Sequence, residues 1–147
     1  MMAETKVGDP AVAPILRLQE AINRHDLEAL VERFTEDYAV EMPVHPARSF
    51  QGSAQVRRNW EQILAGVPDL RAELVAIAVD GGTVWAEWDW SGTRVDGAAH
   101  HLRGTSILGL PGDRIAWSRF YLEPVEVEGP AIDAAIRASL SAAERAG

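Results

Sequence analysis

The sequence predicts an α+β domain in which N-terminal helices pack against an antiparallel sheet. Apolar residues at helical spacing come first in the chain, β-type alternation dominates its second half, and turn signals separate the later strands. Elements that segregate in this order are typical of folds with helices on one face of an antiparallel sheet.

The bulk composition fits a single globular domain. The chain has 147 residues, of which 47% are apolar and 24% charged. A chain of this length can form a stable core without disulfide cross-links. The net charge of −8 disfavours nucleic acid and anionic membranes as partners. The chain contains no cysteine, no apolar run of membrane-spanning length and no secretion signal at its start. We therefore expect a cytoplasmic protein.

The first half of the chain predicts helices, a strand and a further helix. Residues 1–12 are polar, and we expect them to form a flexible leader. Apolar spacing predicts helices over about 14–35, the second of them capped by Asp26. A strand over 38–42 is followed by a loop over 43–52, and a helix runs from Ser53 through Gly66.

The second half predicts consecutive antiparallel strands and a last helix. The expected strands, separated by glycine-containing turns, cover residues 72–79, 83–93, 99–110 and 115–123. Gly129 and Pro130 open a helix with Ile132, Ile136 and Leu140 on one side. We expect one domain over 13–128, with residues 129–147 as its C-terminal helix.

Several short motifs in this order resemble the nuclear transport factor 2-like superfamily and, within it, the SnoaL-like family. The segments that carry the resemblance are 23–27, 34–37, 40–43, Gly52 with Trp60, 67–70, 87–93 and 115–123. The resemblance implies a cone-shaped α+β barrel, in which a curved sheet wraps around a pocket for a small hydrophobic organic molecule. Related proteins include isomerases, epoxide hydrolases, dehydratases and polyketide cyclases, so the fold alone does not give the reaction.

The signatures of the best-defined activities are incomplete here. Leu18, Met42 and Ser106 occupy the positions that match the catalytic residues of the steroid isomerases. At the positions that match the limonene-type epoxide hydrolases, the acid Asp89 is the only signature residue kept, and Glu87 and Phe120 depart. A histidine–carboxylate pair of the kind used by the cyclases is available.

The hairpin at Asp96-Gly97 predicts which side chains share a face of the sheet. A two-residue turn there places Asp89 opposite Gly104 and Glu87 opposite Ser106. One face then collects Trp85, Glu87, Asp89, His100, Ser106 and Phe120, and the resemblance puts this face inside, under the helices. The other face, with Trp88, Trp90, Arg103, Arg119, Tyr121 and Glu123, has the aromatic and arginine content of a homodimer interface. A register slip of one residue would exchange the faces.

With this register, the predicted site is a cofactor-free pocket for general acid/base chemistry. Asp89, His100 and Glu87 are the candidate catalytic residues, because burial shifts carboxyl pKa values toward neutrality and histidine titrates near neutral pH. The candidate substrate-binding residues are Met42, His45, Trp60, Trp85, Ser106 and Phe120. No metal site and no cofactor are expected, since His100-His101 lacks a third ligand at fixed spacing and no glycine-rich phosphate loop occurs.

A simpler interpretation of the same residues stays open. Asp89 and Glu87 are equally consistent with solvated charges on an open sheet face, and His100 with an exposed residue beside a turn. Trp60 fits a core position on its helix. The function is therefore a cofactor-free enzyme acting by proton transfer or, alternatively, a non-catalytic ligand-binding or assembly domain.

Overall fold

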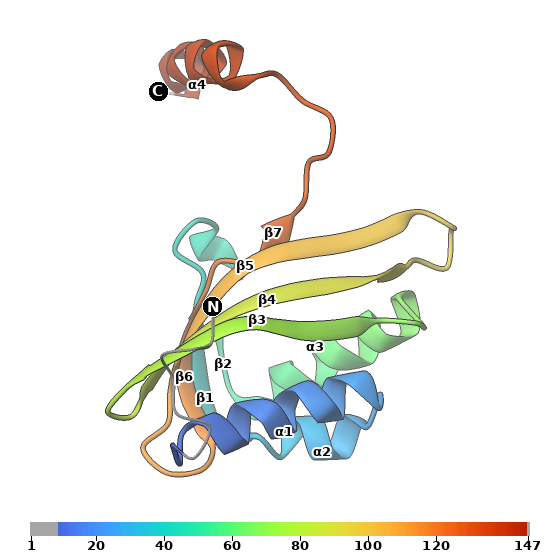
Figure 1. Cartoon of the computed structure of the whole chain (residues 1–147), viewed down its shortest axis with the longest axis vertical. Helices are drawn as coiled ribbons and strands as arrows, with labels where there is room; N and C mark the ends of the chain where they lie inside the picture. The colour runs from blue at the N-terminus through green and yellow to red at the C-terminus, as the bar shows by residue number, and fades with distance from the viewer. Residues whose placement is uncertain (1–8, 147) are drawn as a thin grey trace.

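A computed structural model describes residues 9–146, with side chains to residue 141. The chain runs through helices, a curved sheet and a final helix (Figure 1). The elements are α1 (Val12–Asn23), α2 (Leu27–Val31), β1 (Phe34–Glu41), the 3₁₀ helix η2 (Pro46–Arg48), β2 (Phe50–Gln51), α3 (Ser53–Gly66), β3 (Arg71–Asp80), β4 (Thr83–Thr93), β5 (Ala99–Gly109), β6 (Ile115–Phe120), β7 (Glu123–Pro124) and α4 (Ile132–Ala146).

The strands form one curved, unclosed seven-stranded sheet, which confirms the predicted α+β class. The order is β2-β1-β6-β5-β4-β3, and β7 pairs with β5 beyond the end of β6. All neighbours are antiparallel except β1 and β6, which run parallel. Helices α1, α2 and α3 gather on one side of this sheet (Figure 1), so the side chains between the two layers form the core.

Helix α1 anchors the N-terminal layer through an apolar stripe. Ile15 and Ile22 are fully buried, Leu18 nearly so, and all three face the sheet side of the helix at a spacing of three and four. The helix begins at Val12, which is itself buried. The predicted leader over 1–12 therefore includes Val12, which belongs to the helix. The first eight residues of the leader lie outside the described part of the chain.

The second helix is shorter than predicted because the chain turns early into β1. Asp26 caps α2 as expected, its Oδ1 accepting a hydrogen bond from the backbone N–H of Ala29 at 3.1 Å. The helix ends at Val31, and β1 already begins at Phe34, a residue that the apolar spacing had assigned to the helix. Phe34 is buried on the sheet and lies opposite Ile115 of β6.

The β4–β5 hairpin has a three-residue loop, so the predicted two-residue turn was wrong. The backbone N–H of Arg94 donates to the carbonyl of Ala98 at 2.8 Å, and Gly97 adopts a positive φ of 88° that glycine accommodates without strain. Asp89 consequently pairs with Arg103, and Trp88 pairs with Gly104. This shift of one residue exchanges the two faces of β4 relative to β5.

The C-terminal helix α4 lies apart from the rest of the chain. Figure 1 shows it beyond the sheet, on the side away from α1, α2 and α3, at the end of an extended segment that leaves β7. The segment is fixed at its start, where the backbone N–H of Val125 donates to the carbonyl of His101 at 2.9 Å. Among the described residues, no helix has the length and apolarity to cross a membrane.

Candidate functional site

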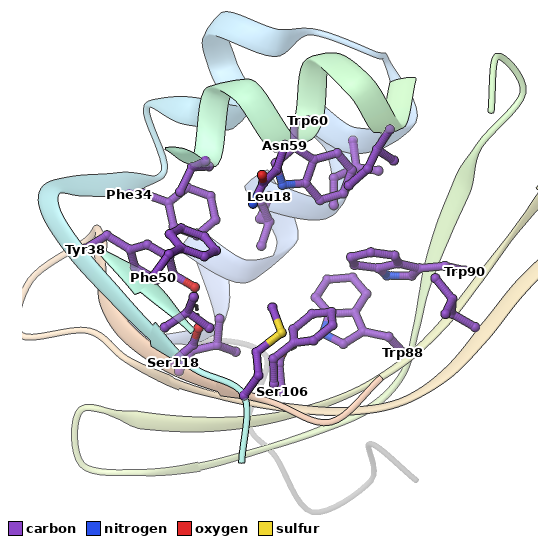
Figure 2. A pocket seen from close by; sticks show the side chains of 18 residues that line it. Leu18, Phe34, Tyr38, Phe50, Asn59, Trp60, Trp88, Trp90, Ser106 and Ser118 are labelled. Atoms are coloured by element: carbon purple, nitrogen blue, oxygen red, sulfur yellow. Dashed lines mark hydrogen bonds between the residues drawn. The ribbon is translucent and has the colours of Figure 1, made fainter. Parts of the chain in front are cut away.

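A cavity of about 240 Å³ lies between the helices and the concave face of the sheet. Its wall is mostly apolar (Figure 2). The aliphatic part of the wall comprises Leu18, Ile22, Val40, Met42, Val56, Ile63, Leu102 and Leu108. A benzene molecule occupies an apolar cavity of about 150 Å³, so this cavity has room for a compound of about two rings.

One side of the cavity is a cluster of aromatic rings. The ring of Trp90 lies 5.4 Å from that of Trp60 on α3, 6.0 Å from that of Phe120 on β6 and 6.1 Å from that of Trp88, measured between centroids. Tilted and edge-to-face geometries of this kind are favourable for aromatic pairs. The indole N–H of Trp90 is buried and has no hydrogen-bond partner among the described residues. The cluster gives the cavity a rigid wall suited to flat apolar molecules.

The opposite side of the cavity carries a polar corner. The hydroxyl groups of Tyr38 on β1 and Ser118 on β6 are hydrogen-bonded to each other, and both residues are buried. Figure 2 shows this pair across the cavity from Trp90. Each hydroxyl has one proton and the mutual bond uses one of the two. The pair therefore retains one O–H that can donate to a ligand.

A second polar contact lies on the floor formed by β4 and β5. The indole N–H of Trp88 donates to Oγ of Ser106 at 3.0 Å, and both residues are buried. This bond uses an acceptor site of the serine and leaves its O–H available. Ser106 pairs with Phe120 and Ser118 with Leu108, so the two serines are diagonal neighbours on the inner face. The amide side chain of Asn59 completes the polar groups of the wall.

Tyr38 is the only titratable side chain among the described residues that line the cavity. Burial raises the pKa of Tyr38 from 10.0 to about 12, against a smaller lowering effect of the hydrogen bond with Ser118. The phenol is therefore protonated throughout the physiological range. It can donate a hydrogen bond to a ligand oxygen, but it cannot serve as a base at neutral pH.

Four of the predicted substrate-binding residues line the cavity. Met42, Trp60, Ser106 and Phe120 belong to its wall. His45 does not: it lies in the loop after β1, where its Nε2 is 3.1 Å from the carboxylate of Glu123. Whether any of these residues contacts a substrate stays a prediction.

The structure places Trp85, Glu87 and Asp89 on the outer face of the sheet, not in the cavity. Residues alternate between the faces of a strand, and in β4 the inner positions are held by Trp88 and Trp90. The predicted inner face was thus wrong for β4, although it was right for Ser106 on β5 and Phe120 on β6. Burying two indoles is favourable, whereas burying two unpaired carboxylates would be costly.

The outer acids form a charged network with residues of β5. Asp89 accepts a hydrogen bond from Nε2 of His101 at 2.9 Å and lies 3.6 Å from the guanidinium of Arg103. The same guanidinium is 3.5 Å from the carboxylate of Glu87. The side chains of this network are all partly exposed, so the pairs contribute little stability. None of these side chains lines the cavity described above.

His100 lies on the inner side of β5 but outside the cavity. It pairs with Gly92 and lies two residues nearer to the hairpin than Leu102, the last residue of β5 on that side that lines the cavity. Partial burial, together with the positive charge of Arg94, lowers the pKa of His100. The predicted trio of Asp89, His100 and Glu87 is therefore not assembled around one space.

Sequence reasoning missed the residues that form the polar corner and half of the aromatic wall. Tyr38, Ser118, Trp88 and Trp90 all line the cavity. For the two indoles a signal was present, because the even-numbered positions of β4 from Val84 to Trp90 are all apolar. Ser118 also had a signal, because it shares one face of its strand with Phe120. For Tyr38 and for its contact with Ser118 no local pattern exists, since the contact joins residues 80 positions apart. No group of three or more potential metal ligands occurs in the described part of the chain.

Comparison with solved structures agrees with this architecture, whereas comparison with curated proteins gives no match. AclR of Streptomyces galilaeus, a candidate hydroxylase, is 18% identical and has a TM-score of 0.69, with 99% of this chain and 96% of that one covered. A candidate isomerase from Bacillus subtilis is also 18% identical, with a TM-score of 0.69 and coverage of 78% and 87%.

A third solved structure and a family model extend this agreement. A candidate SnoaL-like polyketide cyclase from Jannaschia sp. CCS1 is 16% identical, with a TM-score of 0.67 and coverage of 78% of this chain and 85% of that one. At these identities the structures show a shared fold and no shared activity. The model of the SnoaL-like domain matches residues 15–118, a range that contains most of the cavity wall. The chain therefore belongs to the SnoaL-like domain family.

Proposed function

We propose that this chain binds a small, neutral, largely apolar molecule that carries at least one hydrogen-bond acceptor such as a carbonyl oxygen. The observation that supports this most directly is the cavity wall, which is apolar and aromatic except for the hydroxyl groups of Tyr38, Ser118 and Ser106 and the amide of Asn59. Apolar pockets with a few convergent polar groups are typical of small-molecule sites.

The absence of ionised groups from the described wall supports a neutral ligand. A charged ligand would lose its hydration without gaining a counter-charge, which is unfavourable in an apolar cavity. Hydroxyl donors remain on Ser106 and on the Tyr38–Ser118 pair after their internal bonds are made. A ligand oxygen between them would be held by neutral hydrogen bonds, and its apolar body would lie against the indole rings.

The same wall favours binding over general acid/base catalysis. Proton transfer from a ligand at neutral pH requires a base within hydrogen-bond reach, and Asp89, Glu87 and His100 do not line the cavity. A second candidate function is catalysis by hydrogen-bond donation, in which the Tyr38–Ser118 pair stabilises negative charge that develops on a ligand oxygen. The protonated phenol in an apolar wall favours this candidate. A cytoplasmic location remains part of the proposal.

We also expect the chain to act as a homodimer, as the composition of one sheet face suggested. The residues differ from those predicted: Trp88 and Trp90 belong to the cavity, and Trp85 and Trp117 take their place on the outer face. Arg119 stacks on the ring of Trp117 at 5.1 Å. Aromatic and arginine side chains of this kind are enriched at interfaces.

The binding proposal is tested with two bicyclic probes that differ by a single carbonyl group. Indane and 1-indanone have nearly the same shape, and their affinities can be measured by calorimetric titration of the wild type. We expect 1-indanone to bind more tightly, and the double variant Tyr38→Phe/Ser118→Ala, which removes both hydroxyls of the pair, to weaken its binding about five- to tenfold, as for one lost neutral hydrogen bond. The affinity for indane should not change.

The matched control is Thr105→Val, which alters the neighbour of Ser106 on the opposite face of β5. This variant should bind both probes as the wild type does. If neither probe binds, or if Tyr38→Phe/Ser118→Ala weakens the binding of both probes equally, the proposed role of the polar corner is wrong. Turnover of a later-found substrate that is lost in Tyr38→Phe while binding persists would favour the second candidate.

A further inference from the structure

Helix α4 has an apolar stripe with no partner among the described residues. Ile132, Ile136 and Leu140 follow one another at a spacing of four, and their exposed fractions are 72%, 50% and 66%. Figure 1 shows the helix clear of the sheet and of the other helices. An isolated helix of this length is only marginally stable in water. Its apolar face therefore needs a surface to cover it.

The outer face of the sheet offers a surface of matching character that α1, α2 and α3 leave uncovered (Figure 1). Trp85 is 39% exposed and pairs with Ile107, which pairs with Arg119 on the next strand. The ring of Trp117 lies close to Gly109, where a Cβ atom would come within 1.9 Å of it. We call Trp85, Ile107, Trp117 and Arg119 the outer band. Helices α1, α2 and α3 cover the opposite face of the sheet (Figure 1).

The path of the linker separates the helix from the outer band of its own chain. Residues 125–131 connect β7 to α4, and in Figure 1 they carry the helix away from the sheet. Seven extended residues reach at most about 25 Å. That reach suffices for the helix to contact a neighbouring molecule that lies against the same side of the sheet.

We propose that α4 is an exchange arm whose apolar stripe packs on the outer band of a second copy of this chain. The inference rests on the proposed homodimer and names the segment that holds it together. With two-fold symmetry each contact occurs twice, so both arms and both bands are covered and the assembly closes. Beside the band, the carboxylate of Glu87, which lies 3.5 Å from Arg103, is partly exposed and can also meet Arg137 of the arriving helix.

The first test compares one charge placed on two faces of α4 in the full chain. Ile136→Asp introduces a carboxylate into the stripe, whereas Ala138→Asp introduces the same group on the opposite side of the helix. Molar mass is measured by light scattering over a range of micromolar concentrations. We expect a dimeric wild type, a dissociation constant raised at least tenfold by Ile136→Asp, and no change with Ala138→Asp.

The outcomes of this test separate the two proposals. A monomeric wild type would overturn both the homodimer and the exchange arm. A wild type and an Ile136→Asp variant that are equally dimeric would leave the homodimer standing and overturn the arm. Equal weakening by Ile136→Asp and Ala138→Asp would also overturn it, because the effect would then not depend on the apolar face.

A second test determines which chain the arm contacts, and the lack of native cysteines makes it direct. Ala78 is exposed opposite Trp85, and Ser139 lies beside the stripe of α4. We expect Ala78→Cys and Ser139→Cys chains to form a disulfide-linked pair when mixed and oxidised. The control Glu61→Cys, on α3, should form none with Ser139→Cys. A doubly substituted chain that closes its disulfide within one molecule would show that the arm folds back on its own sheet and would overturn the proposal.

Discussion

The hydrogen bond between Tyr38 and Ser118 allows a quantitative test of how the polar corner is built. Tyr38→Phe removes one hydroxyl and leaves the other, on a serine that is 4% exposed, without its partner. A buried polar group left unpaired costs about 1–3 kcal/mol. We therefore expect Tyr38→Phe and Ser118→Ala each to lower the free energy of unfolding by about 1–2 kcal/mol.

The double variant should cost less than the sum of the two single variants. Once both hydroxyls are gone, no unpaired group remains, and only the modest net contribution of the hydrogen bond is lost. We expect a coupling energy of about 1 kcal/mol between the two sites. Urea unfolding of the four proteins, followed by tryptophan fluorescence, measures all the terms of this cycle, provided that the slope against urea stays constant.

The other tyrosine of the chain provides the control. Tyr121 is partly exposed, and Tyr121→Phe should change stability by no more than about 0.5 kcal/mol. Strict additivity of Tyr38→Phe and Ser118→Ala would refute the reasoning, because it would mean that the two hydroxyls do not satisfy each other in the folded protein.

Two further predictions concern pH and packing. Because burial raises the pKa of Tyr38 to about 12 from 10.0, its contribution is fully present below pH 10 and is lost as the pH rises toward 12. Across that window, the stability of the wild type should fall relative to that of Tyr38→Phe by up to about 3 kcal/mol, and a constant difference in urea unfolding would contradict this. Gly109→Ala should destabilise by about 1–3 kcal/mol, since the new Cβ atom would lie 1.9 Å from the ring of Trp117. Gly112→Ala, which meets nothing within 4 Å, is the matched control, and equal melting temperatures for the two variants would show that the ring moves aside freely.

The boundaries of the later strands were predictable because their turns and alternation are local signals. The strand over 83–93 agrees with β4 residue for residue, and the helix from Ser53 to Gly66 agrees with α3. The end of the second helix was harder to predict. Phe34 continues the helical spacing of apolar residues in the sequence, but in the structure it pairs with Ile115 and belongs to β1. A partner so far along the chain cannot be inferred from a short stretch of sequence.

The error in the site came from trusting the hairpin over the hydrophobic pattern. An Asp-Gly pair is typical of a two-residue turn, but it also fits the three-residue loop that occurs here with Gly97 at its last position. The difference of one residue moved Glu87 and Asp89 to the wrong face. Val84, Ala86, Trp88 and Trp90 form an unbroken apolar series on the other face of β4, and a buried face specifies register more strongly than a turn does.

The parallel pairing of β1 with β6 has a consequence for the order of folding. The hairpins of β3, β4 and β5 join neighbouring segments, and such units form within microseconds. The junction of Tyr38 with Ser118 must instead close a loop of 80 residues, and contacts of such long range are made slowly. We therefore expect the cavity to be completed only in the final stage of folding. A ligand that recognises the finished cavity would then slow the unfolding rate and leave the rate of folding nearly unchanged.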